Sequence, residues 1–217
     1  MNQFSIKARL MMGFGAIVAL FILFAAFVYK EMIDVDENLD LITEDLTEIT
    51  EQINEIDRAA GDGRRSMLVV LALRNTNDAS KKVPEIQAAH DEANQSIAKA
   101  KSLIEKAEYG TESDRKNDIA ALDSIDKLWK VYEADESQAI RLAASGDFDG
   151  ALRLVAQGEG RKAYQQMNKL VDGLIERCDK LADEAGKTSQ EDVHNMMHYA
   201  LAAAVIAVIL SVVIAFL

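Results

Sequence analysis

The sequence contains very few residues that interrupt helices or cross-link a chain. Its 217 residues include one proline, one cysteine and only 6% aromatic residues. Proline disrupts a helix interior because it removes a backbone donor, so its scarcity leaves long stretches free to form helices. Cys178 has no partner for an intrachain disulfide and belongs to no CxxC pair, which excludes disulfide scaffolds and paired-thiol metal or redox motifs. The composition is typical of an all-α protein.

Positive charge is also scarce. Lys and Arg number 24 against 36 Asp and Glu, which gives a formal net charge of -12. This balance argues against nucleic acid as a partner, because phosphate contacts need a basic surface. The sequence also offers no nucleophile, base and orienting group that can be assembled into a catalytic set, so we predict neither an enzyme nor a cofactor.

Two uncharged apolar runs lie near the ends of the chain. Leu10–Tyr29 and Tyr199–Leu217 are long enough, at about 1.5 Å per residue, to cross a hydrocarbon core of about 30 Å. The first run exceeds the usual apolar region of a signal peptide, about 7–15 residues, so we expect a retained anchor. Lys7 and Arg9 precede it, which predicts a cytoplasmic N-terminus and an enclosed loop on the other side of the membrane.

These runs divide the chain into four predicted parts. They are a cytoplasmic N-terminus over residues 1–9, a first membrane span over 10–29, a ligand-binding domain over 30–198 and a second span over 199–217.

The segment from Met32 to Arg74 has the pattern of one long helix. Its apolar residues alternate by fours and threes, which keeps a narrow stripe facing a partner helix. Every charged residue from Glu31 to Asp57 is acidic, whereas Arg64 and Arg65 follow near the far end. The pattern predicts a stalk that holds an anion-sensing end away from a membrane. The stripe contains Val35, Leu39, Ile42, Leu46, Ile49, Ile53, Ile56, Ala60, Gly63, Met67 and Val70.

Three further segments show the same rhythm. Asn75–Asp78 ends the first helix, and Pro84 suits the first turn of the second, which we expect to run to about Glu108. A short helical turn over 151–156 separates the third helix from the fourth, which starts near Arg161. Helix lengths of about 45, 25, 31 and 39 residues predict an antiparallel up-down-up-down four-helix bundle whose outer pair continues into the two spans.

Two stretches of sequence carry a family resemblance. IKARLMMGFG, at residues 6–15, resembles the entry to the first span of bacterial methyl-accepting chemotaxis proteins, and ASGDFDGAL, at 144–152, resembles their third connection. The resemblance implies an inner-membrane homodimer with a periplasmic four-helix sensor whose first helices pair across the two-fold axis. It also implies that a small solute binds at the distal end and shifts the fourth helix and second span along the membrane normal.

The resemblance leaves open which class of receptor carries this module and which output it controls. Sensor histidine kinases carry a similar module. No linker domain, methylation helices or kinase-contacting tip follows Leu217, so we expect a truncated receptor or a sensor without its usual effector. The chemotaxis kinase and adaptor would then be reached only through domains outside this sequence.

Arginines near the far end of the first helix are the candidate ligand-binding residues. Guanidinium groups recognise carboxylates in a bidentate fork, and a pair from two subunits can clamp one organic acid at a dimer interface. Arg65 follows Asp62 by three residues and Arg74 precedes Asp78 by four, so intrahelical ion pairs are the alternative explanation. Arg64 has no carboxylate three or four residues away, which favours an external partner.

Neutral residues are expected to complete this site. Tyr164 and Asn168, near the distal end of the fourth helix, can add hydrogen bonds, although packing explains Tyr164 about equally well. Gly61 and Gly63 each cost about 1 kcal/mol in a helix interior, which indicates a kink or a close helix approach beside the arginines. The arginine spacing of aspartate and serine chemoreceptors is not reproduced, so amino-acid specificity is not implied.

The histidines are assigned no ligand role from the sequence. Glu191 and His194 form an E-x-x-H, and His194 and His198 form an i, i+4 pair, but a di-metal bundle needs a second E-x-x-H. We therefore predict no metal and assign this pair to the membrane interface. His90 is interpreted as a tolerated stripe residue because no CxxCH accompanies it. Tyr132 is expected to fill the core, with a pocket-lining role as the alternative.

The sequence therefore predicts a membrane-anchored, dimeric sensor of an extracytoplasmic small molecule, most simply an organic anion. The alternative is a structural or adaptor coiled-coil protein whose partner is another protein.

Overall fold

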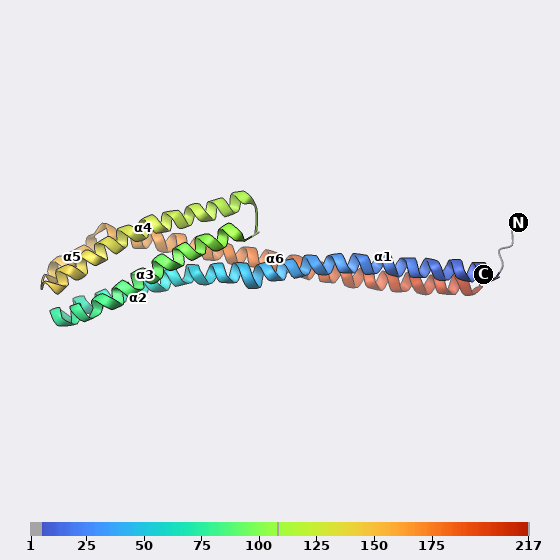
Figure 1. The fold of residues 1–217 in the computed structure, drawn as a ribbon, viewed down its shortest axis with the longest axis horizontal. Helices are drawn as coiled ribbons and strands as arrows, with labels where there is room; N and C mark the ends of the chain where they lie inside the picture. The colour runs from blue at the N-terminus through green and yellow to red at the C-terminus, as the bar shows by residue number, and fades with distance from the viewer. Residues whose placement is uncertain (1–5, 108, 217) are drawn as a thin grey trace. The chain divides into compact units, whose positions relative to one another are not determined.

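The computed structural model describes residues 6–107 and 109–216, and all regular secondary structure within them is helical (Figure 1). Three parts of the predicted organisation lie outside the described residues. They are the N-terminal residues 1–5, the predicted end of the second helix at Glu108, and the last residue of the second span, Leu217. The elements in chain order are α1 (Ile6–Asp40), the π-helix η1 (Leu41–Leu46), α2 (Thr47–Leu73), α3 (Thr76–Lys106), α4 (Glu112–Ala144), α5 (Phe148–Gln157) and α6 (Glu159–Phe216).

The chain forms two compact units. One, the terminal unit, contains residues 1–42 and 183–217, and the other, the bundle unit, contains residues 43–182.

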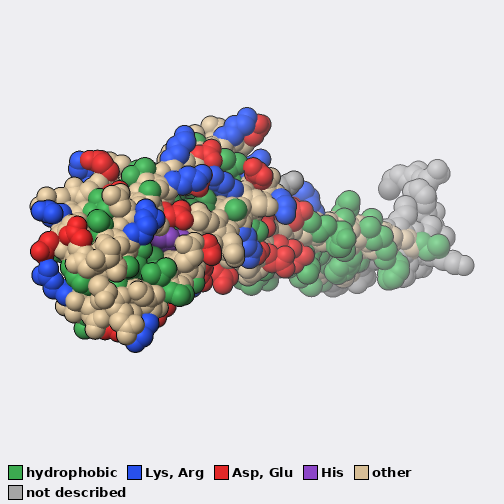
Figure 2. Space-filling model, turned by 60° about the vertical axis from the view of Figure 1, so that its left-hand side comes forward, with side chains coloured by type: hydrophobic (Ala, Val, Ile, Leu, Met, Phe, Trp, Pro, Cys, Tyr) green, Lys and Arg blue, Asp and Glu red, His purple; other side chains and the backbone are tan. Residues whose placement is uncertain are grey.

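The terminal unit consists of α1 with the C-terminal part of α6. Both helices are long and apolar enough to cross a membrane by length and composition, with peak mean hydropathies of 2.1 and 2.3. Large apolar side chains such as Phe14 and Leu201 are exposed on them, and Figure 2 shows hydrophobic side chains covering much of this unit. The rings of Phe27 and Tyr199 meet edge to face at 4.9 Å between their centroids. The two predicted apolar helices are therefore present.

The bundle unit is built from α2, α3, α4 and the first part of α6, with the short α5 between α4 and α6. The predicted stripe of α2 forms its core, since every stripe residue from Leu46 to Val70 is buried. The stripe of α3, from Ile86 to Ala107, is also buried throughout. The predicted fold class, an all-α antiparallel four-helix bundle with two flanking apolar helices, is confirmed.

The predicted long first helix is present, because α1, η1 and α2 follow one another without a break, but the π-helical segment η1 inside it was not predicted. A π-turn contains an extra residue, so it rotates the stripe before it relative to the stripe after it. Leu39, a stripe residue before η1, is accordingly 47% exposed, whereas Leu46 at its end is 2% exposed.

The predicted start of the second helix at Pro84 is also wrong. Helix α3 begins at Thr76 because Asn75 caps it, accepting a hydrogen bond at its side chain from the backbone N–H of Asn77. Arg74 closes α2 in the left-handed conformation, with φ of 50°. The turn therefore needs only two residues, and Pro84 lies inside α3.

The connection from α4 to α6 is more helical than predicted. Helix α5 covers ten residues instead of the predicted 151–156. Asp147 begins it by accepting a hydrogen bond from the N–H of Gly150 at 2.8 Å, and Gly146 supplies the turn before it at φ of 93°. Helix α6 then starts at Glu159, two residues before the predicted Arg161.

Candidate functional site

Arg64 projects from α2 into the half-buried space between helices of the bundle unit. Its guanidinium carbon lies 5.0 Å from the ring centroid of Tyr164 on α6, which is the geometry of a cation–π contact. Within the described part of the chain, no carboxylate forms an ion pair with Arg64. Among the described residues, Arg64 is therefore a cation without a carboxylate partner, and its contact with a ligand stays a prediction.

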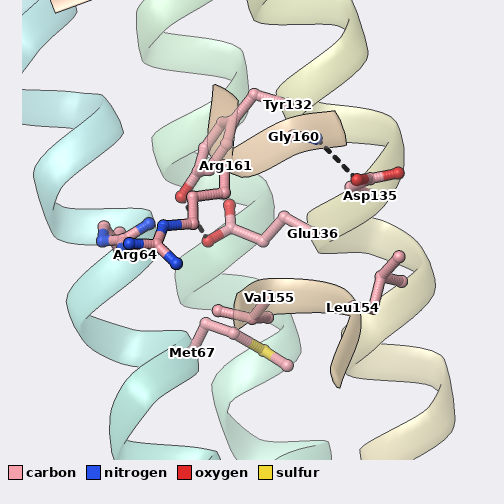
Figure 3. Close-up of a pocket in the computed structure, with 9 residues that line it drawn as sticks. All are labelled: Arg64, Met67, Tyr132, Asp135, Glu136, Leu154, Val155, Gly160 and Arg161. Atoms are coloured by element: carbon pink, nitrogen blue, oxygen red, sulfur yellow. Dashed lines mark hydrogen bonds between the residues drawn. The ribbon is translucent and has the colours of Figure 1, made fainter. Parts of the chain in front are cut away.

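A small pocket lies beside Arg64 (Figure 3). The pocket is partly open to solvent, and its inner volume of about 20 Å³ is enough for one water molecule. The lining residues come from α2, α4, α5 and the beginning of α6, so four elements meet there. They are Arg64, Met67, Tyr132, Asp135, Glu136, Leu154, Val155, Gly160 and Arg161.

Glu136 on α4 is the buried acid of this pocket, only 4% exposed. Its Oε1 accepts a hydrogen bond from the Tyr132 hydroxyl at 2.7 Å, which Figure 3 marks, and its Oε2 lies 2.7 Å from Nε2 of His90 on α3. Burial, together with the nearby Glu136 charge, raises the pKa of Tyr132, so its hydroxyl remains a donor. The three side chains join α3 to α4 beneath Arg64.

Gly63 lies directly against this network. A Cβ atom at Gly63 would stand 3.1 Å from Oε2 of Glu136 and 3.6 Å from Cβ of Ala89. The predicted close helix approach is therefore present at Gly63. At Gly61 a Cβ would meet nothing within 4 Å, so that glycine has no such packing reason.

Asp135 holds the first turn of α6 against α4. Its Oδ2 accepts a hydrogen bond from the backbone N–H of Gly160 at 2.6 Å (Figure 3). A Cβ at Gly160 would lie 2.7 Å from Cβ of Asp135, so only glycine permits this approach. The start of α6 is thus both a wall of the pocket and a contact of α4.

The charged side chains in the pocket wall differ in their hydrogen-bond partners. Asp135 and Glu136 each accept hydrogen bonds from protein donors, and Arg161 donates to the carbonyl of Ala156 at 2.8 Å. Arg64 is the lining cation whose guanidinium contacts an aromatic face instead of an oxygen acceptor among the described residues. An added anion would therefore meet Arg64 without first displacing a carboxylate.

The other two predicted arginines, Arg65 and Arg74, do not line the pocket. Arg65 is exposed and pairs with Asp62 at 3.2 Å, as the intrahelical alternative predicted. Arg74 pairs with Asp149 of α5 at 2.6 Å, so its predicted pairing with Asp78 is wrong. The reason is that α2 ends at Arg74, which places Asp78 on the next helix.

The two predicted residues of α6 differ in their surroundings. Tyr164 contacts Arg64, and its ring centroid is 5.3 Å from that of Tyr132. Asn168 does not line the pocket. Its buried Oδ1 has no hydrogen-bond partner among the described residues. The structure therefore brings Arg64 and Tyr164 together and leaves Asn168 beside them.

Glu136 and His90 are the polar residues whose roles the sequence analysis missed. Glu136 lies four residues after Tyr132 and three before Ala139, which is a stripe position of α4. His90 occupies a stripe position of α3 and is 1% exposed, but it is bonded to Glu136 instead of being merely tolerated. The pair of Glu136 and His90 could have been predicted from one pattern: each residue occupies a stripe position on one of two neighbouring helices.

A four-helix bundle together with two helices long and apolar enough to cross a membrane defines the class: a helical module with two candidate membrane spans. Comparison with protein families matches residues 3–193 to the family described as the four helix bundle sensory module for signal transduction. The match covers most of the chain, and the protein belongs to this family. A search of curated proteins found no significant match.

Proposed function

We propose that this chain is the sensor part of a chemoreceptor, which binds a small organic anion outside the cytoplasm and controls chemotaxis signalling. The observation that supports it most is Arg64, a half-buried cation that lines a pocket and forms no ion pair with the described residues. A carboxylate can accept two parallel hydrogen bonds from one guanidinium group, which makes organic acids the matching ligand class.

Tyr164 supports this assignment by holding Arg64 in place. A guanidinium over an aromatic face keeps its N–H edge free, so the cation is positioned while its donors remain available. Met67 and Val155 add apolar walls for the carbon skeleton of an acid. The neighbouring carboxylates restrict the ligand, because an acid must direct its charge toward Arg64 and away from Glu136.

The small size of the pocket implies that its walls move when a ligand binds. The inner part of the pocket has room for one water molecule, so an organic acid that enters it fully would need the walls to separate. Gly160 and Arg161 form one wall at the start of α6, the helix that also contains the second apolar run. Separation of this wall from Asp135 would displace α6, which is how the proposed receptor would transmit a shift across the membrane.

Location and assembly follow the same proposal. The first span would cover residues 10–29 and the second 199–217, with residues 30–198 in the periplasm of a bacterial inner membrane, as Lys7 and Arg9 indicate. Leu68 and Val69 of α2 are 45% and 41% exposed, and such apolar surface suits a homodimer in which the first helices pair.

The remaining candidate residues would contribute through the dimer. Arg65, with a side chain 76% exposed, can reach a ligand shared between protomers once it leaves Asp62. Asn168 offers a buried amide oxygen without a partner among the described residues, which suits a donor group on the ligand. Arg74, with a side chain 56% exposed, would need to leave Asp149 before it could contact a ligand.

The experiment is calorimetric titration of the full chain in lipid nanodiscs with a panel of mono-, di- and tricarboxylates, with oligomeric state followed in parallel. Saturable binding of one class that also stabilises a dimer is the expected result. No binding across the panel, with a stable dimer already present, would instead favour the structural or adaptor alternative with a protein partner. That alternative is supported by the internal ion pairs of Arg58, Arg65 and Arg74.

A further inference from the structure

His194 and His198 form a second feature that the proposed anion site does not use. They lie one turn apart on α6, in the terminal unit, and both are exposed. Their Nε2 atoms are 2.9 Å apart, and their ring planes cross at 86° with centroids 4.4 Å apart. At this distance the Nε2–H of one ring donates a hydrogen bond to Nε2 of the other, so the two imidazole nitrogens lie next to each other beside the helix.

This separation matches two adjacent ligands of one metal ion. Imidazole nitrogens bind transition metals at about 2.0–2.1 Å, so two nitrogens at a right angle about the ion are about 2.8–3.0 Å apart. A tetrahedral angle would separate them by about 3.3–3.4 Å. The 2.9 Å between the Nε2 atoms is the length of their hydrogen bond, and a metal that replaces the shared proton could bind both nitrogens at a right angle with little movement, as in the tetragonal geometry of Cu²⁺ or Ni²⁺. Cu²⁺ also binds nitrogen ligands more tightly than the other divalent metals of its row.

The same face of α6 offers further donors. Glu191 precedes His194 by three residues, so a rotation of its side chain can bring an oxygen toward the two nitrogens. Glu191, His194 and Met197 line one surface hollow. Within the described residues no group of three His, Cys, Asp or Glu side chains is already assembled, so water would complete the coordination.

We propose that His194 and His198 form a Cu²⁺ site on α6, immediately before the second apolar run that starts at Tyr199. The sequence alone predicted no metal here because a second E-x-x-H is missing. The short distance between the two nitrogens is the observation that the structure adds. A metal held by residues one turn apart clamps that turn, so Cu²⁺ would stiffen α6 next to the membrane.

The test is titration of the full chain in nanodiscs with CuCl₂, followed by calorimetry and electron paramagnetic resonance. The wild type should bind one Cu²⁺ per chain with a tetragonal spectrum that shows nitrogen coupling. His194→Ala and His198→Ala should each weaken binding at least ten-fold, and the double variant should lose the nitrogen-coupled spectrum. Asn195→Ala, in the same hollow, is the matched control and should bind as the wild type does.

Two features make this test decisive. The chain has three histidines, and the third, His90, is 1% exposed, so a background histidine site is suppressed. The substituted histidines are exposed, so helical content by circular dichroism should not change. Equal Cu²⁺ affinity in the double variant and the wild type would overturn the proposal. Carboxylate titration of the same variants should match the wild type, which separates this result from the Arg64 site.

Discussion

Oε2 of Glu136 lies 2.7 Å from Nε2 of His90, and both side chains are buried between α3 and α4. Removing one member of such a pair leaves the other buried without its partner, which costs about 3–5 kcal/mol. We therefore expect His90→Leu to lower the free energy of unfolding by about this amount. The double variant with Glu136→Gln should recover part of the loss, because it removes the unpaired charge. Denaturant unfolding by circular dichroism measures both, and equal stability of the single and double variants would contradict this account of the pair.

Gly63 and Gly61 provide a matched pair of substitutions on α2. Gly61→Ala should raise stability by up to about 1 kcal/mol, because alanine favours the helix and its Cβ meets nothing within 4 Å. Gly63→Ala should lower stability by about 1–3 kcal/mol, because its Cβ would press on Glu136, whose carboxylate is held by two hydrogen bonds. Thermal unfolding of both variants is the measurement. A gain in stability at both positions would show that Glu136 can move.

The first turn of α4 should make stability depend on pH. Hydrogen bonds from the side chain and backbone N–H of Thr111 lower the pKa of Asp114 from 3.8 to about 2. Because the folded pKa lies below the unfolded one, the stabilisation is complete above about pH 4 and disappears as the pH falls toward 2. Asp114→Asn should therefore melt below the wild type at neutral pH, and the gap should narrow on acidification. A gap that stays constant from pH 7 to pH 2 would contradict this role.

The partner of Arg74 can be tested by double-mutant cycles. The ion pair with Asp149 is exposed, so its coupling energy should be about 0.2–1 kcal/mol, and the cycle with Asp78 should give no coupling. Unfolding free energies of the single and double alanine variants provide both values. Coupling to Asp78 alone would restore the intrahelical pairing that the sequence suggested.

Much of the fold could be predicted because it depends on local periodicity. The alternation of Ile49, Ile53 and Ile56 predicts a buried stripe, and all three are fully buried. Apolar spacing alone also predicted the stripe of α3. These features depend on residues three and four apart in one helix, which a sequence shows directly.

The features that could not be predicted depend on contacts between distant residues or on competing local preferences. Arg74 meets Asp149, which is 75 positions away, and no intrahelical spacing reveals that pair. Pro84 was assigned to a first turn because proline is tolerated there, but the cap at Asn75 starts α3 earlier. Glu136 is hard to predict because a charged residue is rarely buried, and only its spacing from Tyr132 and Ala139 places it on the stripe.

The proposed site depends on both kinds of feature. Arg64 differs from the other two candidate arginines because no carboxylate lies three or four residues away in the sequence. The structure places Arg64 beside a pocket. The other walls, Asp135 and Gly160, come together only because α6 begins against α4. A sequence without distance information cannot show that meeting.

The most direct test of the central claim compares Arg64→Ala with Arg65→Ala in carboxylate titration of the full chain. Arg64 lines the pocket, whereas Arg65 is exposed and paired with Asp62, so the two adjacent arginines form a matched pair. Arg64→Ala should weaken binding more than ten-fold, with helical content and dimer unchanged, because a bidentate charge-assisted contact is lost. Arg65→Ala should change affinity less than Arg64→Ala does. Unchanged affinity in Arg64→Ala would remove this residue from the site and contradict the account.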